Sequence, residues 1–256
     1  MKQLKHALLA AALAASSGLA AASAVNSTSY AGINGSTATF NALGAGGDLL
    51  SGIVSSGGVQ FGERFAGQAL SVTNVPTSPT TQAFFDNLAF GTPASGLTLL
   101  AGADGANLGI YDYGDAKGNA LVGIGPANPS NPDEDPWGNG AISARFATGQ
   151  SALGFFLRDG DGGDAWLSLY RADGSLIQTL TLDLNLPDYE GYFAFAREGG
   201  VADIAGFSLW NSDSYYGIAI DDLRFGAVQA SVPEPGSLLL LAAGLGAAGW
   251  ARRRRS

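Results

Sequence analysis

The sequence has no cysteine, and its only histidine is His6, close to the N-terminus. Without cysteine the chain forms no disulfide, and beyond His6 it lacks the thiolate and imidazole ligands that zinc and copper sites usually use. The same absences exclude Ser-His-Asp and Cys-His nucleophile systems from the rest of the chain. What remains is carboxylate chemistry: pairs of acidic side chains, or oxygen-only sites for Ca²⁺ or Mg²⁺.

Basic residues are also scarce. Between Val25 and Ser231 there are seven arginines and lysines against 21 acidic residues, so this region has a net charge of −14, and Lys117 is its single lysine. Nucleic-acid binding needs a positive surface that neutralises phosphates. We therefore expect no nucleic-acid partner. We also expect anionic membranes and acidic glycans to be repelled unless cations bridge them.

The first 24 residues have the pattern of a cleaved secretory signal. Residues 2–6 form a basic start, Ala7–Ala15 is an unbroken apolar run, and small residues close on Ala22–Ala24. Such a segment is handled by the secretion translocon and removed by signal peptidase. We predict a signal peptide over residues 1–24 and a mature chain that starts near Val25.

Residues 229–256 combine a proline pair, an apolar segment and a basic end. Pro233, Glu234 and Pro235 oppose helix formation and fix an extended entry. Gly236–Ala251 is apolar, and its helix would be about 24 Å long, a marginal length for a membrane span. Cationic flanks stay on the cytoplasmic side, and four arginines follow: Arg252, Arg253, Arg254 and Arg255. They argue against a buried core helix, but leave open a permanent or a temporary anchor.

This order of a Pro-Glu-Pro triplet, a short hydrophobic helix and an arginine cluster resembles the PEP-CTERM sorting signal. The resemblance implies a substrate of an exosortase, a membrane-embedded cysteine transpeptidase-like enzyme that cuts at or near the triplet. It also implies an exported bacterial protein, transiently anchored in the inner membrane and then placed at the cell surface or in the extracellular matrix. Two competing tails fit worse, because there is no LPxTG motif and no cysteine for lipid attachment.

The region between the two ends, residues 25–228, has the composition of an all-β domain. Glycine is about twice as frequent as its usual roughly 7%, with 38 glycines in 256 residues. Short alternating runs such as Leu108–Tyr113 and Ser151–Arg158 recur between clusters of turn-forming residues. These features predict one antiparallel β-sandwich of jelly-roll type. The signal peptide and a short transmembrane helix would flank it.

The clearest strand pair is predicted within Asp164–Leu184. Apolar and polar residues alternate on both sides of Asp173-Gly174. Asp-Gly between two such runs is a strong hairpin signal, because both residues tolerate positive φ. In this hairpin we expect Trp166 to lie in the core.

Two groups of carboxylates are candidates for Ca²⁺ binding through flexible oxygen ligands. The first is Asp159, Asp161 and Asp164, in a Gly-rich turn that does not fit an EF-hand loop. Its alternative interpretation is a solvated hairpin turn. The second is Asp221 and Asp222, which could also accept sugar hydroxyls or simply end strand pairing.

A β-bulge is predicted at the second carboxylate group. Ile218 and Ile220 have one parity along the strand, whereas Leu223 and Phe225 have the other. Only an extra residue at positions 221–222 would place all four apolar side chains on one face, and bulges are common beside sites.

Four aromatic residues are candidates for stacking on sugar rings: Trp137, Trp210, Tyr215 and Tyr216. An exposed aromatic ring offers apolar area with a polar edge. The alternative is that these rings fill the core or cover a sheet edge. The closing strand Gly217–Gly226 resembles the last strand of jelly-roll carbohydrate-binding and lectin-like modules.

The function predicted from these features is a non-enzymatic structural or adhesive role at the cell surface or in the matrix, linked to exopolysaccharide or biofilm. No catalytic constellation and no cofactor is predicted, apart from the calcium interpretation. One alternative is a secreted carbohydrate-active enzyme with an Asp/Glu pair. Another is a lectin-like module that binds carbohydrate or calcium, and a third is a coat protein without a ligand.

Overall fold

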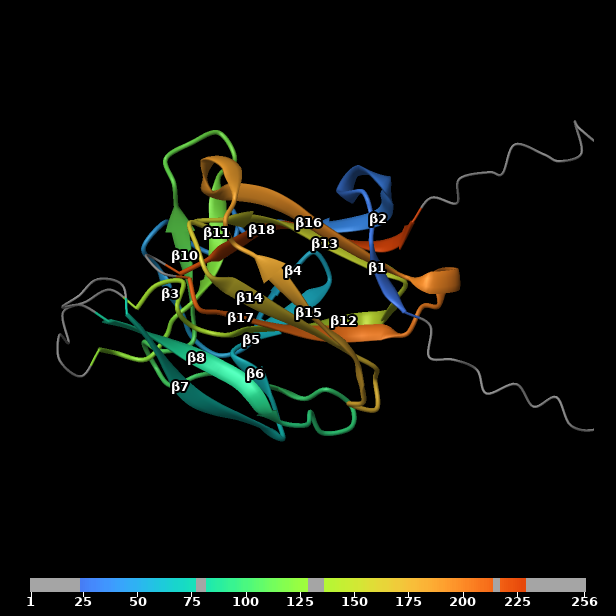
Figure 1. The fold of residues 1–256 in the computed structure, drawn as a ribbon, viewed down its shortest axis with the longest axis horizontal. Coiled ribbons are helices and arrows are strands. Elements are labelled where there is room, and N and C mark those ends of the chain that lie inside the picture. The colour runs from blue at the N-terminus through green and yellow to red at the C-terminus, as the bar shows by residue number, and fades with distance from the viewer. Residues whose placement is uncertain (1–23, 77–81, 129–135, 214–216, 229–256) are drawn as a thin grey trace, which may run out of the picture.

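The computed structural model describes residues 24–76, 82–128, 136–213 and 217–228. Over these ranges β-strands are the main secondary structure, and most of them form two antiparallel sheets that pack face to face (Figure 1). The predicted all-β sandwich is therefore confirmed. Apart from Ala24, the predicted signal peptide and sorting segment lie outside the described residues. The described ranges contain no helix that is long and apolar enough to span a membrane.

Sheet A has eight strands. Its order is β1-β16-β13-β18-β11-β10-β3, and β2 pairs with the second half of β18 beside this path. The bounds are β1 Val25–Ser27, β2 Ile33–Ala38, β3 Leu49–Leu50, β10 Leu108–Asp112, β11 Asn119–Gly123, β13 Ala152–Arg158, β16 Glu190–Arg197 and β18 Ala219–Val228.

Sheet B has six strands in the order β15-β14-β17-β12-β5-β4. These are β4 Val54–Ser56, β5 Val59–Gly62, β12 Ile142–Gln150, β14 Asp164–Tyr170, β15 Leu176–Asp183 and β17 Ile204–Asn211. Two further pairs are β6 (Arg64–Phe65) with β9 (Leu99–Leu100), and β7 (Gln68–Pro76) with β8 (Gln82–Gly91). Short 3-10 helices are η1 Tyr30–Gly32, η2 Pro187–Tyr189 and η3 Glu198–Gly200.

The core lies between the inner faces of the two sheets. In β13 the alternate residues Leu153, Phe155 and Leu157 point inward, because successive side chains of a strand face opposite sides. The ring of Phe155 stacks on Phe207 of β17, with 6.4 Å between ring centroids. Leu167 of β14 joins the same cluster from sheet B. The period-two pattern of the sequence thus builds the core and leaves the alternate residues for the outer faces.

The predicted hairpin at residues 164–184 is confirmed, with a correction to its turn. β14 and β15 pair antiparallel. Gly174 has φ +86° and its N–H donates to the carbonyl of Arg171 at 2.9 Å. Asp173 is not in the positive-φ region; its carboxylate instead accepts a hydrogen bond from Ser175 N at 2.9 Å. Only the glycine therefore uses the conformation that was expected of both residues.

The predicted β-bulge in β18 is also confirmed. Phe156 of β13 pairs with Asp221 and Gly154 pairs with Arg224, so β18 has one extra residue between these pairs. Asp222 has φ +47° at this point. The four apolar side chains with mixed parity all reach the main core: Ile218, Ile220, Leu223 and Phe225.

The Gly-rich turn that follows β13 connects the two sheets. β13 pairs with β16 and β18 in sheet A, whereas β14 pairs with β15 and β17 in sheet B. Residues 159–163 are therefore a crossover, and the alternative interpretation as a hairpin turn is wrong. Gly and Asp composition indicates a turn, but it does not encode which sheet the next strand joins.

Both ends of the sandwich lie at one pole of the molecule (Figure 1). Residues 26–28 of the first strand region and residues 227–228 at the end of β18 line the same hollow of about 490 Å³. Residues 196–200 complete its wall. The chain thus enters and leaves the sandwich on the same side.

Candidate functional site

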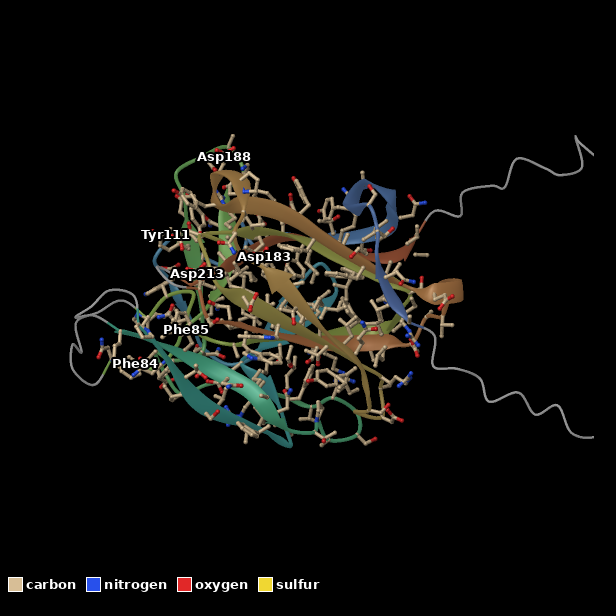
Figure 2. All side chains as sticks on the ribbon, viewed as in Figure 1. Phe84, Phe85, Tyr111, Asp183, Asp188 and Asp213 are labelled. Atoms are coloured by element: carbon tan, nitrogen blue, oxygen red, sulfur yellow. The ribbon has the colours of Figure 1, made fainter. Side chains whose placement is uncertain are left out.

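A groove of about 450 Å³ lies between the β7–β8 hairpin and the outer face of sheet B. We call it the hairpin groove. Figure 2 shows Phe84 and Phe85 on the hairpin side of the molecule. The lining of the hairpin groove comprises Thr73, Asp86, Asn87, Leu88, Ala89, Gly91, Thr92, Pro93, Trp166, Ser168, Tyr170, Leu176, Thr179, Trp210, Asn211 and Ser212.

Strand alternation places the aromatic floor of this groove. Because Leu167 and Leu169 point into the core, Trp166, Ser168 and Tyr170 face outward from β14. Trp210 of β17 pairs directly with Trp166 in the register, so the two side chains lie on the same face. Their rings stack with centroids 6.1 Å apart and 25° between planes.

The hairpin is fixed over sheet B through the first half of β8. Asp86 N donates to the carbonyl of Asn139 at 3.0 Å, and Ala141 N donates to Asp86 Oδ2 at 3.2 Å. Leu88 packs with Trp210 and Ala141 in a small buried cluster. These contacts attach the hairpin firmly, so the groove is a built feature of the fold.

Asp86 is the ionisable group that defines the electrostatics of the groove. It is 7% exposed, and burial raises the pKa of its carboxyl to about 6, although the bond from Ala141 and the charge of Arg64 oppose this shift. Among the described residues that line the groove there is no lysine or arginine. The groove is therefore weakly acidic, and it becomes negative above about pH 6.

Fixed polar groups surround the tryptophans. The hydroxyls of Ser168 and Thr179 are 2.7 Å apart, and Asn87 Nδ2 donates to Thr73 Oγ1 at 3.0 Å. Apolar ring area with a few oriented hydroxyl, amide and carboxyl groups is the usual composition of a small-molecule or sugar site. This arrangement can hold a hydroxyl-rich ligand by stacking and hydrogen bonding.

The outer face of sheet A is covered instead. Residues 113–118 join β10 to β11, lie over this face and are called the clasp here. Arg158 of β13, 1% exposed, pairs with Asp115 of the clasp and with Glu190 of β16. Its guanidinium lies 3.7 Å from the ring centroid of Tyr113. Lys117 pairs with Glu190 as well. These charges neutralise one another.

Aromatic rings continue beside the clasp. The Tyr192 ring packs in tilted geometry against Tyr30 and Phe156, with ring centroids 4.6 Å and 4.7 Å away. The hydroxyl of Tyr30 donates to the carbonyl of Asp222 at 2.7 Å, and burial together with the Asp222 charge raises the pKa of Tyr30 to about 12. The bulge in β18 thus positions the carbonyl of Asp222 that accepts the hydrogen bond from Tyr30.

The three acidic residues of the first predicted Ca²⁺ group have different surroundings. Asp159 accepts the hydroxyl of Tyr113 at 2.5 Å, and burial raises the pKa of both groups. Asp161 Oδ1 is buried without a hydrogen-bond partner in the described chain. Its N–H donates to Asp213 Oδ2 at 3.1 Å, while Asp164 is exposed at the start of β14.

The second predicted pair lies on β18. Asp221 is 2% exposed and accepts a hydrogen bond from the N–H of Asp222 at 2.7 Å. Burial raises its pKa to about 6. Within the described ranges, no three acidic or histidine side chains form a group that could hold a metal ion. The calcium interpretation stays a prediction.

The aromatic candidates are separated by the fold. Trp210 lines the hairpin groove, whereas Trp137 packs on sheet A against Ile124 and near Tyr111, whose ring centroid is 6.3 Å away. Figure 2 shows Tyr111 on that side of the molecule. The other two candidates, Tyr215 and Tyr216, lie outside the described residues. Trp166, expected in the core, is only half-buried and faces the groove, so that expectation is wrong.

Sequence reasoning missed Asp86, Asn87 and the whole hairpin that forms the roof of the groove. Alternation within β14 carried part of the signal, because it put Trp166 on the face opposite Leu167. No local pattern indicates which distant segment covers that face.

No curated protein matches this chain. The chain is similar to the crystal structure of a family 29 carbohydrate-binding module, with 14% identity over 51% of this chain and 84% of that one and a TM-score of 0.31. It is also similar to a Clostridium stercorarium family 6 carbohydrate-binding module in complex with cellobiose, with 16% identity, 46% and 81% coverage, and a TM-score of 0.28.

A third similarity is to the enzymatically active domain of tailspike protein 4 of bacteriophage CBA120. Identity is 14% over 47% of this chain, the TM-score is 0.31, and the match spans only 18% of the tailspike chain. With TM-scores near 0.3, these likenesses concern part of a β-sandwich, and no functional inference follows from them.

A family model matches the segment that follows the sandwich. The match is to the PEP-CTERM protein-sorting motif and covers residues 231–255. It includes the Pro-Glu-Pro triplet, the apolar segment and the arginine cluster that carried the sequence resemblance. Such a motif implies an exported substrate of an exosortase that is sorted to the cell surface. The chain therefore carries a PEP-CTERM protein-sorting motif.

Proposed function

We propose that this protein is an exported surface or matrix component that binds polysaccharide in the hairpin groove without altering it chemically. Its signal peptide directs export through the translocon, and an exosortase cuts near Pro233–Pro235 after transient anchoring in the inner membrane. The mature sandwich then has a structural or adhesive role at the cell surface or in an exopolysaccharide matrix or biofilm.

The stacked pair Trp166–Trp210 in the hairpin groove is the observation that carries this proposal. Its two rings, 6.1 Å apart, form an apolar floor, and the half-buried Trp166 presents part of its surface to the groove. Sugar rings have apolar C–H faces and polar hydroxyl edges, which suit an aromatic floor with hydrogen-bonding walls. The groove offers both.

The lining of the groove favours binding over catalysis. A glycosidase of the common type uses two carboxyl groups beside the scissile bond. Asp86 is the single carboxyl-bearing residue among the described residues of the lining. A ligand in the groove thus meets an acceptor for its hydroxyls but no acid–base pair. This supports a non-enzymatic role.

A glycan array tests the proposal. The mature sandwich is compared with Trp166→Ala, with and without EDTA to examine calcium, and reducing-sugar release is measured on the bound glycans. We expect binding by the wild type, loss in the variant and no sugar release. Binding that survives in the variant would contradict the groove as the site, and release of reducing ends would favour the enzyme.

Processing is tested in the native host. Mass spectrometry of the secreted protein should find termini near Val25 and near Pro233–Pro235. Deletion of residues 231–256 should prevent normal surface delivery. Recovery of an extracellular protein that still ends in Arg252–Arg255 would contradict processing by an exosortase.

A further inference from the structure

We infer that the hairpin groove selects uncharged glycans over carboxylated ones, and that Asp86 is the residue that sets this selectivity. The inference rests on the proposed function, because it names the class of polysaccharide that the same groove accepts.

The charges around the groove support this selectivity. Asp86 lines it without any cation among its described neighbours in the lining. Arg64 of β6 is the cation whose charge lowers the pKa of Asp86, and it is already paired with Glu63. An anionic sugar placed on the tryptophans would therefore bring a second negative charge into a partly desolvated groove with no counterion. Like charges in such a site repel strongly.

Asp86 lines the groove, and the fold holds its side chain in place. Its Oδ2 accepts the N–H of Ala141 at 3.2 Å, and its own N–H donates to Asn139 O at 3.0 Å. The side chain therefore cannot turn away when a carboxylated ligand arrives without losing a buried hydrogen bond. For a neutral sugar the same carboxylate is an acceptor for a hydroxyl, which gives a charge-assisted hydrogen bond. Asp86 thus favours binding of ligand hydroxyls and disfavours binding of ligand carboxylates.

Selectivity should rise with pH, since burial raises the pKa of Asp86 to about 6. The charged group that acts on this carboxyl is the Arg64 guanidinium from β6. Tyr170 of β14 lines the same groove and stays neutral, because burial raises the pKa of its hydroxyl. Between pH 5.5 and 8 a uronate-type ligand remains ionised. A change in the neutral-to-acidic binding ratio over this range is expected from Asp86, because Asp86 is the single carboxyl-bearing residue among the described residues of the lining.

The test uses three matched pairs of polymers: hydroxyethyl- and carboxymethyl-cellulose, pullulan and carboxymethyl-pullulan, and curdlan and carboxymethyl-curdlan. Affinity electrophoresis at pH 5.5 and pH 8 compares the wild type with Asp86→Asn, whose amide oxygen can still accept the N–H of Ala141. Asp183→Asn is the matched control, because Asp183 is an exposed acid of β15 that does not line the groove. Melting curves verify folding.

We expect the wild type to prefer the neutral member of a bound pair at least tenfold at pH 8 and less at pH 5.5. Asp86→Asn should reduce the preference several-fold and make it independent of pH, and Asp183→Asn should leave it unchanged. Equal wild-type binding of both members, or equal effects of the two variants, would overturn the selectivity inference alone. Absence of binding to every neutral polymer would contradict the proposed function itself. If Asp86→Asn does not fold, the wild-type measurements at pH 5.5 and pH 8 still test the inference, because a preference for the neutral polymer that does not rise with pH would overturn it.

Discussion

The outer faces of the two sheets differ in how their polar groups are used. On sheet A, Arg158 is enclosed by Asp115, Glu190 and the Tyr113 ring, so its charge is satisfied within the protein. On sheet B, the hairpin holds Asp86 beside two tryptophans and leaves a hollow. The outer face of sheet A thus uses its polar groups in contacts that stabilise the fold, whereas polar groups on the sheet B side line a hollow.

Arg158→Ala is the variant with the largest expected effect, and it tests whether the polar groups of sheet A stabilise the fold. This change removes a buried charge from its ion pairs with Asp115 and Glu190, of which only Glu190 keeps a second cation, Lys117. Breaking a buried ion pair costs about 3 kcal/mol or more in the free energy of unfolding. Because both partners are partly exposed, we expect a loss of about 3 kcal/mol by urea denaturation. Glycan affinity per folded molecule should not change.

The exposed Arg145 of β12 provides the matched control for this measurement. Arg145→Ala should stay within about 0.5 kcal/mol of the wild type, as surface substitutions usually do. Similar losses in both variants would mean that the enclosure of Arg158 contributes nothing of its own.

Trp166→Ala tests the other face. We expect glycan affinity to fall at least tenfold, which corresponds to about 1.4 kcal/mol, while the melting temperature changes little because Trp166 is only half-buried. Isothermal titration calorimetry measures the affinity. Trp137→Ala, on sheet A, should leave affinity unchanged, and an equal loss there would place the ligand on the wrong face.

Each face also has one buried acid whose pKa is raised to about 6, Asp86 on sheet B and Asp221 on sheet A. Because these folded-state pKa values lie above the ordinary 3.8, the stability that each protonated group contributes is complete below about pH 4. It is lost as the pH rises through 6. Asp86→Asn and Asp221→Asn should each reduce this decline.

Urea denaturation between pH 4 and 7 measures the effect. We expect about 2 kcal/mol for each site, because each pKa rises from 3.8 to about 6 and one pKa unit corresponds to about 1.4 kcal/mol. The lowered pKa values of Asp115, Asp173 and Asp183 act in the opposite direction at low pH, but they cancel in the comparison of variant with wild type. Parallel stability profiles would refute the assignment.

The smallest expected effect is that of Lys117→Gln. Its ion pair with Glu190 is at the surface, with the lysine side chain 46% exposed, and such pairs contribute about 0.5 kcal/mol or less. A loss as large as that of Arg158→Ala would show that the clasp depends on Lys117 as much as on the enclosed arginine.

The sequence allowed prediction of features that depend on local parity. Alternation identified the β14–β15 hairpin, and the parity change between Ile220 and Leu223 identified the bulge, because each pattern is complete within one or two strands. The crossover at residues 159–163 was misread since its partners are set by strands far along the chain. For the same reason the groove was missed, as Asp86 and Trp166 are brought together only by long-range packing.

The shared pole of the two chain ends has a mechanical consequence. Val25 and Val228 lie on the same side of the sandwich. In a molecule anchored through its tail, as proposed, a pull on the tail would be borne first by β18 and its neighbours β2 and β13. The hairpin lies away from that side (Figure 1). Under the proposed cleavage near Pro233–Pro235, removal of the tail would therefore act at the opposite side from Trp166 and Asp86, and the tethered and the released molecule would keep the same groove.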